Sequence, residues 1–356
     1  MSRLKKFNII LAALNGVLII TAGLLIGKTV SLKNEYSSDN AKKAWDGEKY
    51  SYSQISVFLP TDNSLDILGV YSMRQSVEEK LKENSVTSDK DNPEGRLWID
   101  CASGESSLSL SGSLGSCTAA VTGTFGDYFI FHPEKLMSGS YYSDDDINID
   151  RVILDRECSW QLFGSMDTVG MPVNIGNKVF YVAGVVESPD SKIDKAAYGD
   201  TPRVYMPFES LKAFNESSAL SCYEVCLPNV VKDYAYTVMK DLSPAGENSV
   251  VVDQSGRFGL IKLISGSSEI SESVMIKTKM ALPWYENRLR SAELSARLAA
   301  APIPYLLIIP AVSLVYALFM LTKLAGRGAR AIKDKAEERY QKKISDIYYK
   351  KHNSQK

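Results

Sequence analysis

The residue types that most often carry out catalysis are scarce in this chain. Histidine occurs only at His132 and His352, so zinc sites built on several histidines and Ser-His-Asp triads lack their usual components. His132 lies between Phe131 and Pro133, and we interpret it as a packed loop residue. Carboxylates are numerous, but no pattern places two of them in one cleft for acid–base catalysis. We therefore predict no catalytic residue, no metal site and no cofactor.

One stretch, Gly23–Thr29, reads GLLIGKT and is similar to a phosphate-binding loop. Its spacing is one residue short, because Ala22 stands where the first glycine of such a loop would be. The stretch also lies in an uncharged apolar run. We interpret it as part of a membrane helix.

A second stretch alternates acidic and amide residues like the start of a calcium-binding loop, at Asp144, Asp146, Asn148 and Asp150. The position that needs glycine holds Ile149, and the last ligand position holds Asp155 instead of glutamate. These departures favour a turn that enters a strand over a calcium site.

Five cysteines lie between the two apolar runs of the chain. Cys101 and Cys117 flank a Ser/Gly-rich hairpin segment, so they could form a disulfide in an oxidising compartment. Cys222 and Cys226 would share one face of a strand about 13 Å apart, which is too far for a disulfide unless a turn lies between them. Cys158 falls in a helical patch and is interpreted as a packing residue.

The two apolar runs, residues 7–27 and 303–322, are each long enough to cross the roughly 30 Å hydrocarbon core of a bilayer. The first follows a basic start and could be a signal peptide, but it is too long for one and no small-residue cleavage pattern follows it. The second contains Pro304 and Pro310, which would suit a buried core helix, yet membrane helices tolerate proline. We predict two transmembrane helices.

Charge predicts the orientation of these helices. Residues 1–6 carry three basic and no acidic side chains, and residues 323–356 carry 11 basic and four acidic ones, whereas the region between the spans has a net charge of −11. By the positive-inside preference, both termini are cytoplasmic and residues 28–302 are extracytoplasmic. An acidic ectodomain also argues against nucleic acid as a partner.

The middle of the ectodomain, residues 150–187, has the pattern of a β-α-β-β module. Its predicted elements are a strand at Val152–Leu154, a helix that ends at Leu162, Phe163 and Gly164, a turn at Gly170, and strands at Val173–Ile175 and Val179–Val186. Glycine after an amphipathic patch is typical of a helix C-cap.

Strand, helix, strand patterns occur on both sides of this module. They lie at 50–60, 70–86 and 97–101, and again at 223–227, 231–242 and 249–252, with a hairpin expected over 103–116. We therefore predict an α+β fold with an inserted, mainly β subdomain. The expected parts are a stalk at 28–49, a first half at 50–118, an insertion at 119–217, a second half at 218–265 and a second stalk at 266–302.

The tail from Ala331 to Tyr349 places apolar residues on one helical stripe against lysine and arginine. A basic amphipathic helix of this kind can lie on anionic lipid or dock on a partner. The alternative is a solvated tail that only anchors the topology.

Several short motifs occur in an order that resembles the extracytoplasmic core domain of the MacB/FtsX-type ABC permease superfamily. They are Gly126-Asp-Tyr-Phe, His132-Pro-Glu-Lys-Leu with Gly139, Ser143-Asp-Asp-Asp, Arg151-Val-Ile-Leu-Asp, Leu162-Phe-Gly164, Val169-Gly170, Val182-Ala-Gly184-Val185 and Tyr205-Met-Pro207. The resemblance covers roughly residues 50–265. It implies a β-rich Sabre-like insertion between two Porter-like β-α-β halves.

The same resemblance implies a non-catalytic membrane subunit of an ABC-type export or mechanotransmission complex, whose ectodomain binds a substrate or partner protein. Permeases of this superfamily usually have four membrane spans, whereas this chain has two. An ABC ATPase and a full permease subunit are therefore the expected partners, with a homo- or heterodimer also open. The alternative is a stand-alone surface sensor or adhesion module with the same ectodomain and no coupling to ATP.

Two groups of residues are candidates for structural or binding roles. Gly126, Gly164, Gly170 and Gly184 are expected to serve turns and close packing. An aromatic group could form either an exposed binding patch or part of the core, at Phe129, Phe131, Tyr141 and Tyr142.

Overall fold

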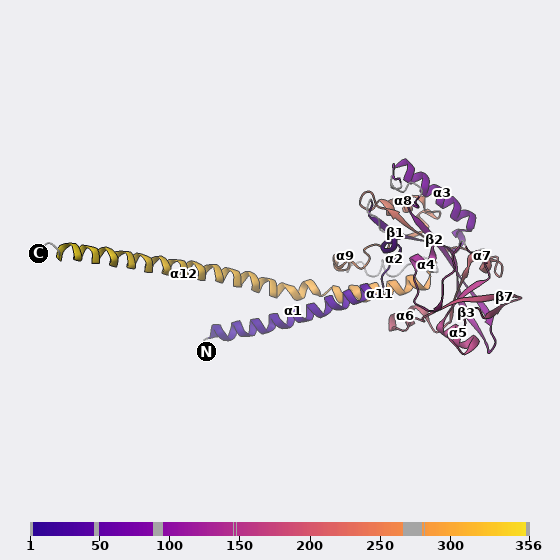
Figure 1. The fold of residues 1–356 in the computed structure, drawn as a ribbon, viewed down its shortest axis with the longest axis horizontal. Helices are drawn as coiled ribbons and strands as arrows, with labels where there is room; N and C mark the ends of the chain where they lie inside the picture. Colours follow the sequence, from indigo (N-terminus) through magenta and orange to yellow (C-terminus); the bar gives the residue numbers. More distant parts are fainter. Residues whose placement is uncertain are drawn as a thin grey trace. The chain divides into compact units, whose positions relative to one another are not determined.

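The structure of the chain is a computed structural model (Figure 1). It describes residues 3–45, 50–87, 95–144, 146, 148–265, 280 and 282–353. The chain divides into two compact units, one made of residues 1–28 and 299–356 and the other of residues 29–298.

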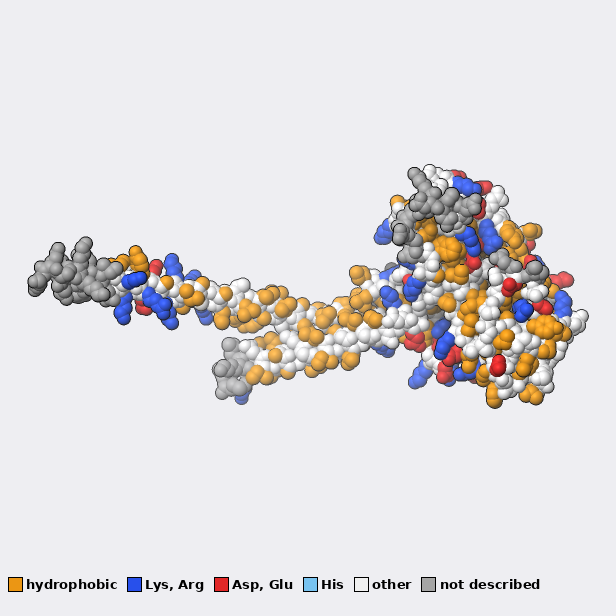
Figure 2. All heavy atoms as spheres, in the orientation of Figure 1, with side chains coloured by type: hydrophobic (Ala, Val, Ile, Leu, Met, Phe, Trp, Pro, Cys, Tyr) orange, Lys and Arg blue, Asp and Glu red, His pale blue; other side chains and the backbone are white. Residues whose placement is uncertain are grey.

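The first unit contains most of the two longest helices, α1 (Arg3–Glu35) and α12 (Ile303–Asn353). Both are long and apolar enough to cross a membrane, in agreement with the two predicted spans. Large apolar side chains such as Leu24 and Val315 are about 70% exposed, and orange apolar spheres are frequent along α1 and the first part of α12 in Figure 2. Such a surface is suited to lipid and not to water. Gly23–Thr29 is regular helix, so it forms no phosphate-binding loop.

In the same unit, α12 is apolar at its start and basic toward its end, where Lys and Arg spheres gather in Figure 2. The tail from 331 is helical, as predicted. Asn15 of α1 accepts a hydrogen bond of 3.4 Å from the hydroxyl of Ser313. A polar contact of this kind joins apolar helices without a hydrophobic driving force.

The second unit is built on one ten-stranded mixed sheet. Its strand order is β10-β1-β9-β2-β3-β8-β5-β7-β4, and β6 pairs with both β2 and β7. The strands are β1 (Tyr52–Phe58), β2 (Ile99–Ser111), β3 (Ser116–Gly126), β4 (Leu136–Gly139), β5 (Arg151–Asp155), β6 (Pro172–Ile175), β7 (Lys178–Val186), β8 (Arg203–Pro207), β9 (Cys222–Pro228) and β10 (Val250–Asp253). The α+β class predicted from the sequence is confirmed.

Helices cover both faces of this sheet. One face carries α3 (Ile67–Glu83), α5 (Arg156–Phe163), α7 (Phe208–Lys212) and α8 (Tyr234–Leu242), and Figure 1 shows α3 beside α8. The other face carries α2 (Asn40–Trp45), α4 (Tyr128–Phe131) and the start of α11 (Trp284–Ala300). The short elements η1 (Thr61–Asn63), α6 (Lys192–Tyr198), η2 (Gly246–Asn248) and α9 (Leu260–Ser265) connect them.

Helix α3 illustrates how the sequence pattern forms these layers. Val70, Met73, Val77 and Leu81 recur at helical spacing, and all four are buried against the sheet. The side chain of Asp66 caps the first turn by accepting a 2.8 Å hydrogen bond from the backbone nitrogen of Gly69. The helix predicted over 70–86 is therefore confirmed, beginning three residues earlier and ending three residues earlier.

The β-α-β-β module is also confirmed, as β5, α5, β6 and β7. Asp155 caps the start of α5, and Gly164 ends it in the left-handed conformation at φ 64°. Gly126 and Gly170 also have positive φ, at 75° and 79°. Gly184 has no such φ, but a side chain there would meet the backbone of β4.

The proposed disulfide between Cys101 and Cys117 is wrong. The expected hairpin exists, but β2 and β3 pair with Cys101 opposite Gly126 and with Cys117 opposite Leu110. The two thiols therefore lie nine positions apart along the hairpin, about 30 Å at the rise of a strand. All five cysteines are free and buried.

The division into two Porter-like halves and an inserted Sabre-like part stays a prediction. Strands from both chain halves, β1, β9 and β10, do lie side by side, but β2 and β3 join them to the insertion in one continuous sheet. Of the predicted stalks, 29–35 and 284–298 are helical, whereas residues 46–49 and 266–279 lie outside the described part.

Candidate functional site

Strands β2 and β9 lie next to each other and carry functional side chains on both faces of the sheet. Asp100 and Tyr223 point to the face covered by α3, because Asp100 Oδ2 accepts hydrogen bonds from Arg74 of α3 (2.7 Å) and from the Tyr223 hydroxyl (3.0 Å). Cys101 and Glu224 follow them in sequence and therefore point to the opposite face. The first face holds a cleft, and the second holds the attachment of the stalk helices.

The second face contains a group that we call the stalk junction. It joins the end of α1 and the start of α11 to the sheet. Its members are Tyr36, Gln54, Gln254, Arg257, Glu286 and Glu293.

Arg257 is the centre of the stalk junction. Its Nη1 and Nη2 donate to the two carboxylate oxygens of Glu286 at 2.9 and 3.0 Å, and its Nε donates to Glu293 at 2.6 Å. Both glutamates belong to α11, and all three side chains are almost completely buried. Burial by itself lowers the pKa of Arg257, but the two carboxylates outweigh it and raise the pKa above its usual value. A planar guanidinium that satisfies two carboxylates at once holds α11 in one orientation.

Each glutamate also pairs with an arginine one turn further along α11. Arg290 donates to Glu286 at 2.6 Å, and Arg297 donates to Glu293 at 2.6 Å. Removing one partner from such a network leaves a buried charge uncompensated, which costs about 3–5 kcal/mol. The network is therefore a rigid attachment and not a loose surface contact.

The segment that follows α1 reaches the same region from the other side. The Ser38 hydroxyl donates to the carbonyl of Gln254 at 3.0 Å, and the Ala41 amide donates to the side chain of Gln54 at 3.0 Å. Gln254 in turn donates to Glu286 at 3.2 Å. Gln254, just after β10, thus links α11 to the segment that follows α1.

Helix α6 provides a second link between the stalk helices. Its N-cap residue Ser191 makes a 2.6 Å hydrogen bond with the hydroxyl of Tyr36, and its third residue Asp194 accepts a 2.5 Å bond from Arg288 of α11. The guanidinium of Arg288 also lies 5.0 Å from the ring of Tyr36. The two side chains that form the capping box of α6, Ser191 and Asp194, therefore also bond to groups from the two stalks.

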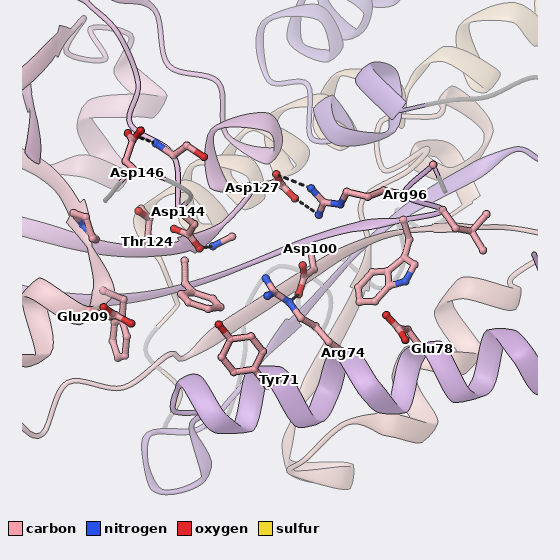
Figure 3. Close-up of a pocket in the computed structure, with 18 of the residues that line it drawn as sticks. Tyr71, Arg74, Glu78, Arg96, Asp100, Thr124, Asp127, Asp144, Asp146 and Glu209 are labelled. Atoms are coloured by element: carbon pink, nitrogen blue, oxygen red, sulfur yellow. Dashed lines mark hydrogen bonds and ion pairs between the residues drawn. The ribbon is translucent and has the colours of Figure 1, made fainter. Parts of the chain in front are cut away.

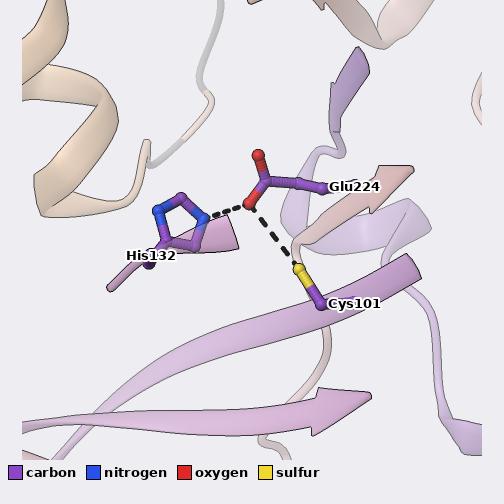
Figure 4. A group of neighbouring side chains, drawn as sticks. All are labelled: Cys101, His132 and Glu224. Carbon is purple, nitrogen blue, oxygen red and sulfur yellow. Dashed lines mark hydrogen bonds and ion pairs between the residues drawn. The ribbon is translucent and has the colours of Figure 1, made fainter. Parts of the chain in front are cut away.

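A chain of hydrogen bonds continues from the stalk junction to the end of α4. Gln254 donates to Ser56 at 3.1 Å, and Ser56 donates to Glu224 at 2.5 Å. Glu224 then forms an ion pair with the partly buried His132 (Figure 4). Tyr285 of α11 donates to the same carboxylate at 3.4 Å. Burial alone raises the pKa of Glu224, but His132 and these donors reverse the effect and lower it.

Cys101, His132 and Glu224 place three possible metal-ligating atoms within 4.8 Å of one another. Thiolate, imidazole and carboxylate are the donors that zinc takes. Glu224 already accepts from Ser56, Tyr285 and His132, so these donors satisfy the carboxylate. We interpret the group as an ion pair packed against a thiol. His132 is a packed residue, as predicted. Its partner Glu224 was not identified from the sequence. A glutamate among the apolar residues of β9 is nevertheless a visible sign of a buried, paired carboxylate.

The first face contains a cleft of about 780 Å³ between α3, the ends of β2 and β3, and the segment before β5 (Figure 3). Its apolar wall includes Tyr71, Trp98 and Phe125. Arg74 lies 5.4 Å from the Tyr71 ring and 5.1 Å from the Phe125 ring while it pairs with Asp100. The volume is in the range of clefts that bind small molecules or single side chains of a partner.

Carboxylates outnumber cations in this cleft. Among the residues that the structure describes, six acidic ones line the cleft, namely Glu78, Asp100, Asp127, Asp144, Asp146 and Glu209, against three basic ones, Arg74, Lys82 and Arg96. Each of these cations pairs with a carboxylate of the lining. Arg74 pairs with Asp100 at 2.7 Å, Lys82 with Glu78 at 3.7 Å, and Arg96 with Asp127 at 2.6 Å. The remaining surface carries negative charge next to aromatic rings, which suits a cationic ligand with an apolar part.

The acidic stretch from Asp144 to Asp150, which is similar in sequence to the start of a calcium-binding loop, forms turns. Asp144 accepts a hydrogen bond from the amide of Gly126, and Asp146 accepts one from the amide of Ser143 at 3.0 Å. The segment then leads into β5, as predicted, with residues 145 and 147 outside the described part.

The aromatic candidates belong to the core. Phe131 and Tyr142 are buried, and Phe129 stacks on Tyr141 with ring centroids 4.4 Å apart. Tyr142 also makes a 2.8 Å hydrogen bond with Thr124. The glycines Gly164, Gly170 and Gly184 lie in the central module, and Gly126 lies at the cleft.

Comparison with known proteins gives one family. Residues 16–231 match the model of the MacB-like periplasmic core domain. Over 94 residues the chain is 32% identical to the macrolide export ATP-binding/permease protein MacB of Chromobacterium violaceum. The aligned stretch covers 26% of this chain and 14% of that protein. The chain thus spans about one seventh of the length of this curated relative.

Two solved structures that are similar to this chain are distant in sequence. The periplasmic region of MacB from Actinobacillus actinomycetemcomitans is 17% identical, with 59% of this chain and 92% of that chain covered and a TM-score of 0.40. The extracellular domain of the noncanonic ABC-type transporter YknZ from Gram-positive bacteria is 16% identical, with 56% and 99% covered and a TM-score of 0.36.

Proposed function

Because the chain belongs to the MacB-like periplasmic core domain family, we propose that it is a non-catalytic membrane subunit of an ABC-type export or mechanotransmission complex. In this proposal, ATP hydrolysis by a partner drives movement of the two membrane helices. The ectodomain then changes its grip on a substrate or partner protein.

The observation that carries this proposal is the stalk junction. A mechanical coupling requires that the moving helices be fixed to the domain they move. Helix α11 is fixed by Arg257 through three hydrogen bonds of 2.6–3.0 Å to Glu286 and Glu293, and the segment that follows α1 is linked to the same site by the bond from Ser38 to Gln254. A buried network in which every charge is paired keeps its geometry better than an exposed ion pair does, so it can transmit a movement of α11 to the sheet.

The cleft is the proposed binding site of the ectodomain. It is connected to the stalk junction through β9 and β2, because the Tyr223 hydroxyl of β9 donates to Asp100 of β2, which lines the cleft, while the neighbouring Glu224 accepts from Ser56 and from Tyr285 of α11. Movement of α11 would therefore reach the cleft through neighbouring residues of the same two strands. We expect the ligand to be cationic with an apolar part, because the described part of the lining has three more carboxylates than cations.

The proposed partners follow from the same hypothesis. We assign ATP hydrolysis to a separate ABC ATPase and the remaining membrane helices to a full permease subunit, with which this chain would pair. We propose that both termini are cytoplasmic and that residues 28–302 are extracytoplasmic, which the acidic middle and the basic flanks of the sequence support.

Affinity purification of the full-length chain from detergent-solubilised native membranes tests this function. The expected result is co-isolation of an ABC ATPase and a permease, both retained by an R257M variant, because that residue lies in the ectodomain and not in the membrane helices. A bait made of the same two helices and an unrelated ectodomain is the matched control. Recovery of neither partner, with and without mild cross-linking, would count against the proposal.

The stand-alone sensor or adhesion module is the second candidate, and the cleft is the observation that favours it. Deleting the basic tail from 331 to 356 distinguishes the two. A sensor that needs only its ectodomain should keep ligand binding and function. A subunit coupled to an ATPase should keep binding of a cationic fluorescent probe to the purified protein but lose export.

A further inference from the structure

Two cysteines of the inserted region lie in contact although the sequence separates them by 41 residues. The Sγ atoms of Cys117, on β3, and Cys158, on α5, are 3.5 Å apart. Cys158 is fully buried and Cys117 is 9% exposed. Neither residue belongs to the stalk junction or to the cleft.

The backbone around the pair already holds α5 against the β2–β3 turn. The amide of Leu114 donates to the carbonyl of Leu162 at 3.0 Å, and Gly112 and Gly115 leave no room for a side chain beside Leu162 and Gln161. A disulfide needs its sulfur atoms about 2.05 Å apart. The thiols therefore need to approach by roughly 1.5 Å, which small side-chain rotations at two well-placed residues can provide.

The two thiols also differ in acidity. The hydrogen bond from Cys158 lowers the pKa of Cys117, and the same contact together with burial raises the pKa of Cys158. Cys117 is therefore the thiol that more readily becomes the attacking thiolate. It is also the more exposed of the two, so an oxidant reaches it first.

We propose that Cys117 and Cys158 form a disulfide when the ectodomain folds outside the cytoplasm, in place of the Cys101–Cys117 pairing expected from the sequence. The oxidant is a disulfide-bearing partner, either a thiol–disulfide oxidoreductase or a small disulfide. The Cys117 thiolate attacks one sulfur of that disulfide and releases the other as a thiol. The Cys158 thiolate then attacks the Cys117 sulfur and releases the second thiol.

The exchange balances as two protein thiols oxidised and one partner disulfide reduced to two thiols. The bond would close a loop that contains β3, α4, β4 and β5. Such a loop loses freedom in the unfolded chain, so the disulfide stabilises the folded state. The remaining cysteines, Cys101, Cys222 and Cys226, stay reduced.

The experiment counts free thiols in the full-length protein. Cells are quenched in acid, and the purified chain is alkylated in denaturant before and after reduction. We expect three alkylated cysteines before reduction and five after it, with a Cys117–Cys158 peptide pair and a mass 2 Da below that of the reduced chain.

Variants separate this bond from other pairings. C117S and C158S should each leave a single unpaired thiol, raising the count before reduction to four, while C101S should lower it to two. A reductant should lower the melting temperature of the wild type and C101S but not that of C117S. Five alkylated cysteines in the wild type before reduction, or a linked peptide containing Cys101, would overturn the proposal even if a variant fails to fold.

Discussion

The R257M substitution should destabilise the ectodomain far more than the loss of an exposed ion pair. Methionine fills a similar volume but leaves Glu286 and Glu293 without the guanidinium that bonds to both carboxylates. These carboxylates are almost completely buried, so water cannot replace the lost donors.

The expected cost follows from that geometry. Breaking a buried, hydrogen-bonded ion pair from one side costs about 3–5 kcal/mol. Arg290 and Arg297 still pair with the two glutamates, which places the result toward the lower end of that range. For a domain of this size, such a loss lowers the melting temperature by on the order of 10 °C. R257K keeps the charge but not the planar fork, so it should fall between R257M and the wild type.

Thermal unfolding of the full-length chain in detergent measures this effect. K135M is the matched control, because Lys135 and Glu187 pair at 3.0 Å while both side chains are well exposed. Exposed pairs contribute about 0–1 kcal/mol, so K135M should melt close to the wild type. If R257M has the same melting temperature as K135M, the stalk junction is not the rigid attachment described above.

Three further predictions concern the same unit. Glu224 has a folded pKa below its usual 4.5, so the stability it contributes is present above that pH and is lost as the pH falls through the lower folded value. E224Q should therefore flatten the acid side of the stability curve, and an unchanged acid slope would contradict the assigned ion pair. G164A should cost about 1 kcal/mol by urea denaturation, because φ is 64° there, and G170A, also at positive φ, serves as its comparison. D66A removes the N-cap of α3 and should lower the free energy of unfolding by about 1 kcal/mol, with reduced hydrogen-exchange protection at the start of α3. Loss of protection only outside α3 would contradict the capping role of Asp66.

Local pattern explains most of the predicted architecture. The apolar spacing of α3 and the run of β-branched residues in β7 depend on neighbours in sequence, so a single chain reveals them. The glycine at the end of α5 was visible for the same reason, because the left-handed cap at Gly164 is a local backbone demand.

Features that depend on strand register could not be predicted. A disulfide between Cys101 and Cys117 looked reasonable from a short Ser/Gly-rich hairpin, but β2 has 13 residues and pairs along its length with β3. The hairpin therefore separates the two thiols, while the return of α5 brings Cys158 to Cys117. No periodicity within either segment carries that information.

The stalk junction was missed for a related reason. Arg257 lies in a turn after β10, and Glu286 and Glu293 lie on a helix that reads as an ordinary charged stalk. Seven-residue spacing places the two glutamates on one helical face, which is a visible signal. Their burial, however, depends on the sheet face that α11 covers.

Hydrogen exchange of the assembled complex tests the central claim most directly. The complex is compared without nucleotide and during ATP hydrolysis, and exchange is followed in peptides covering α11 and β9. Coupling through the stalk junction predicts altered exchange in both peptides, and loss of the change in β9 when Arg257 is replaced by methionine. Active ATP hydrolysis with no change in either ectodomain peptide would contradict the account.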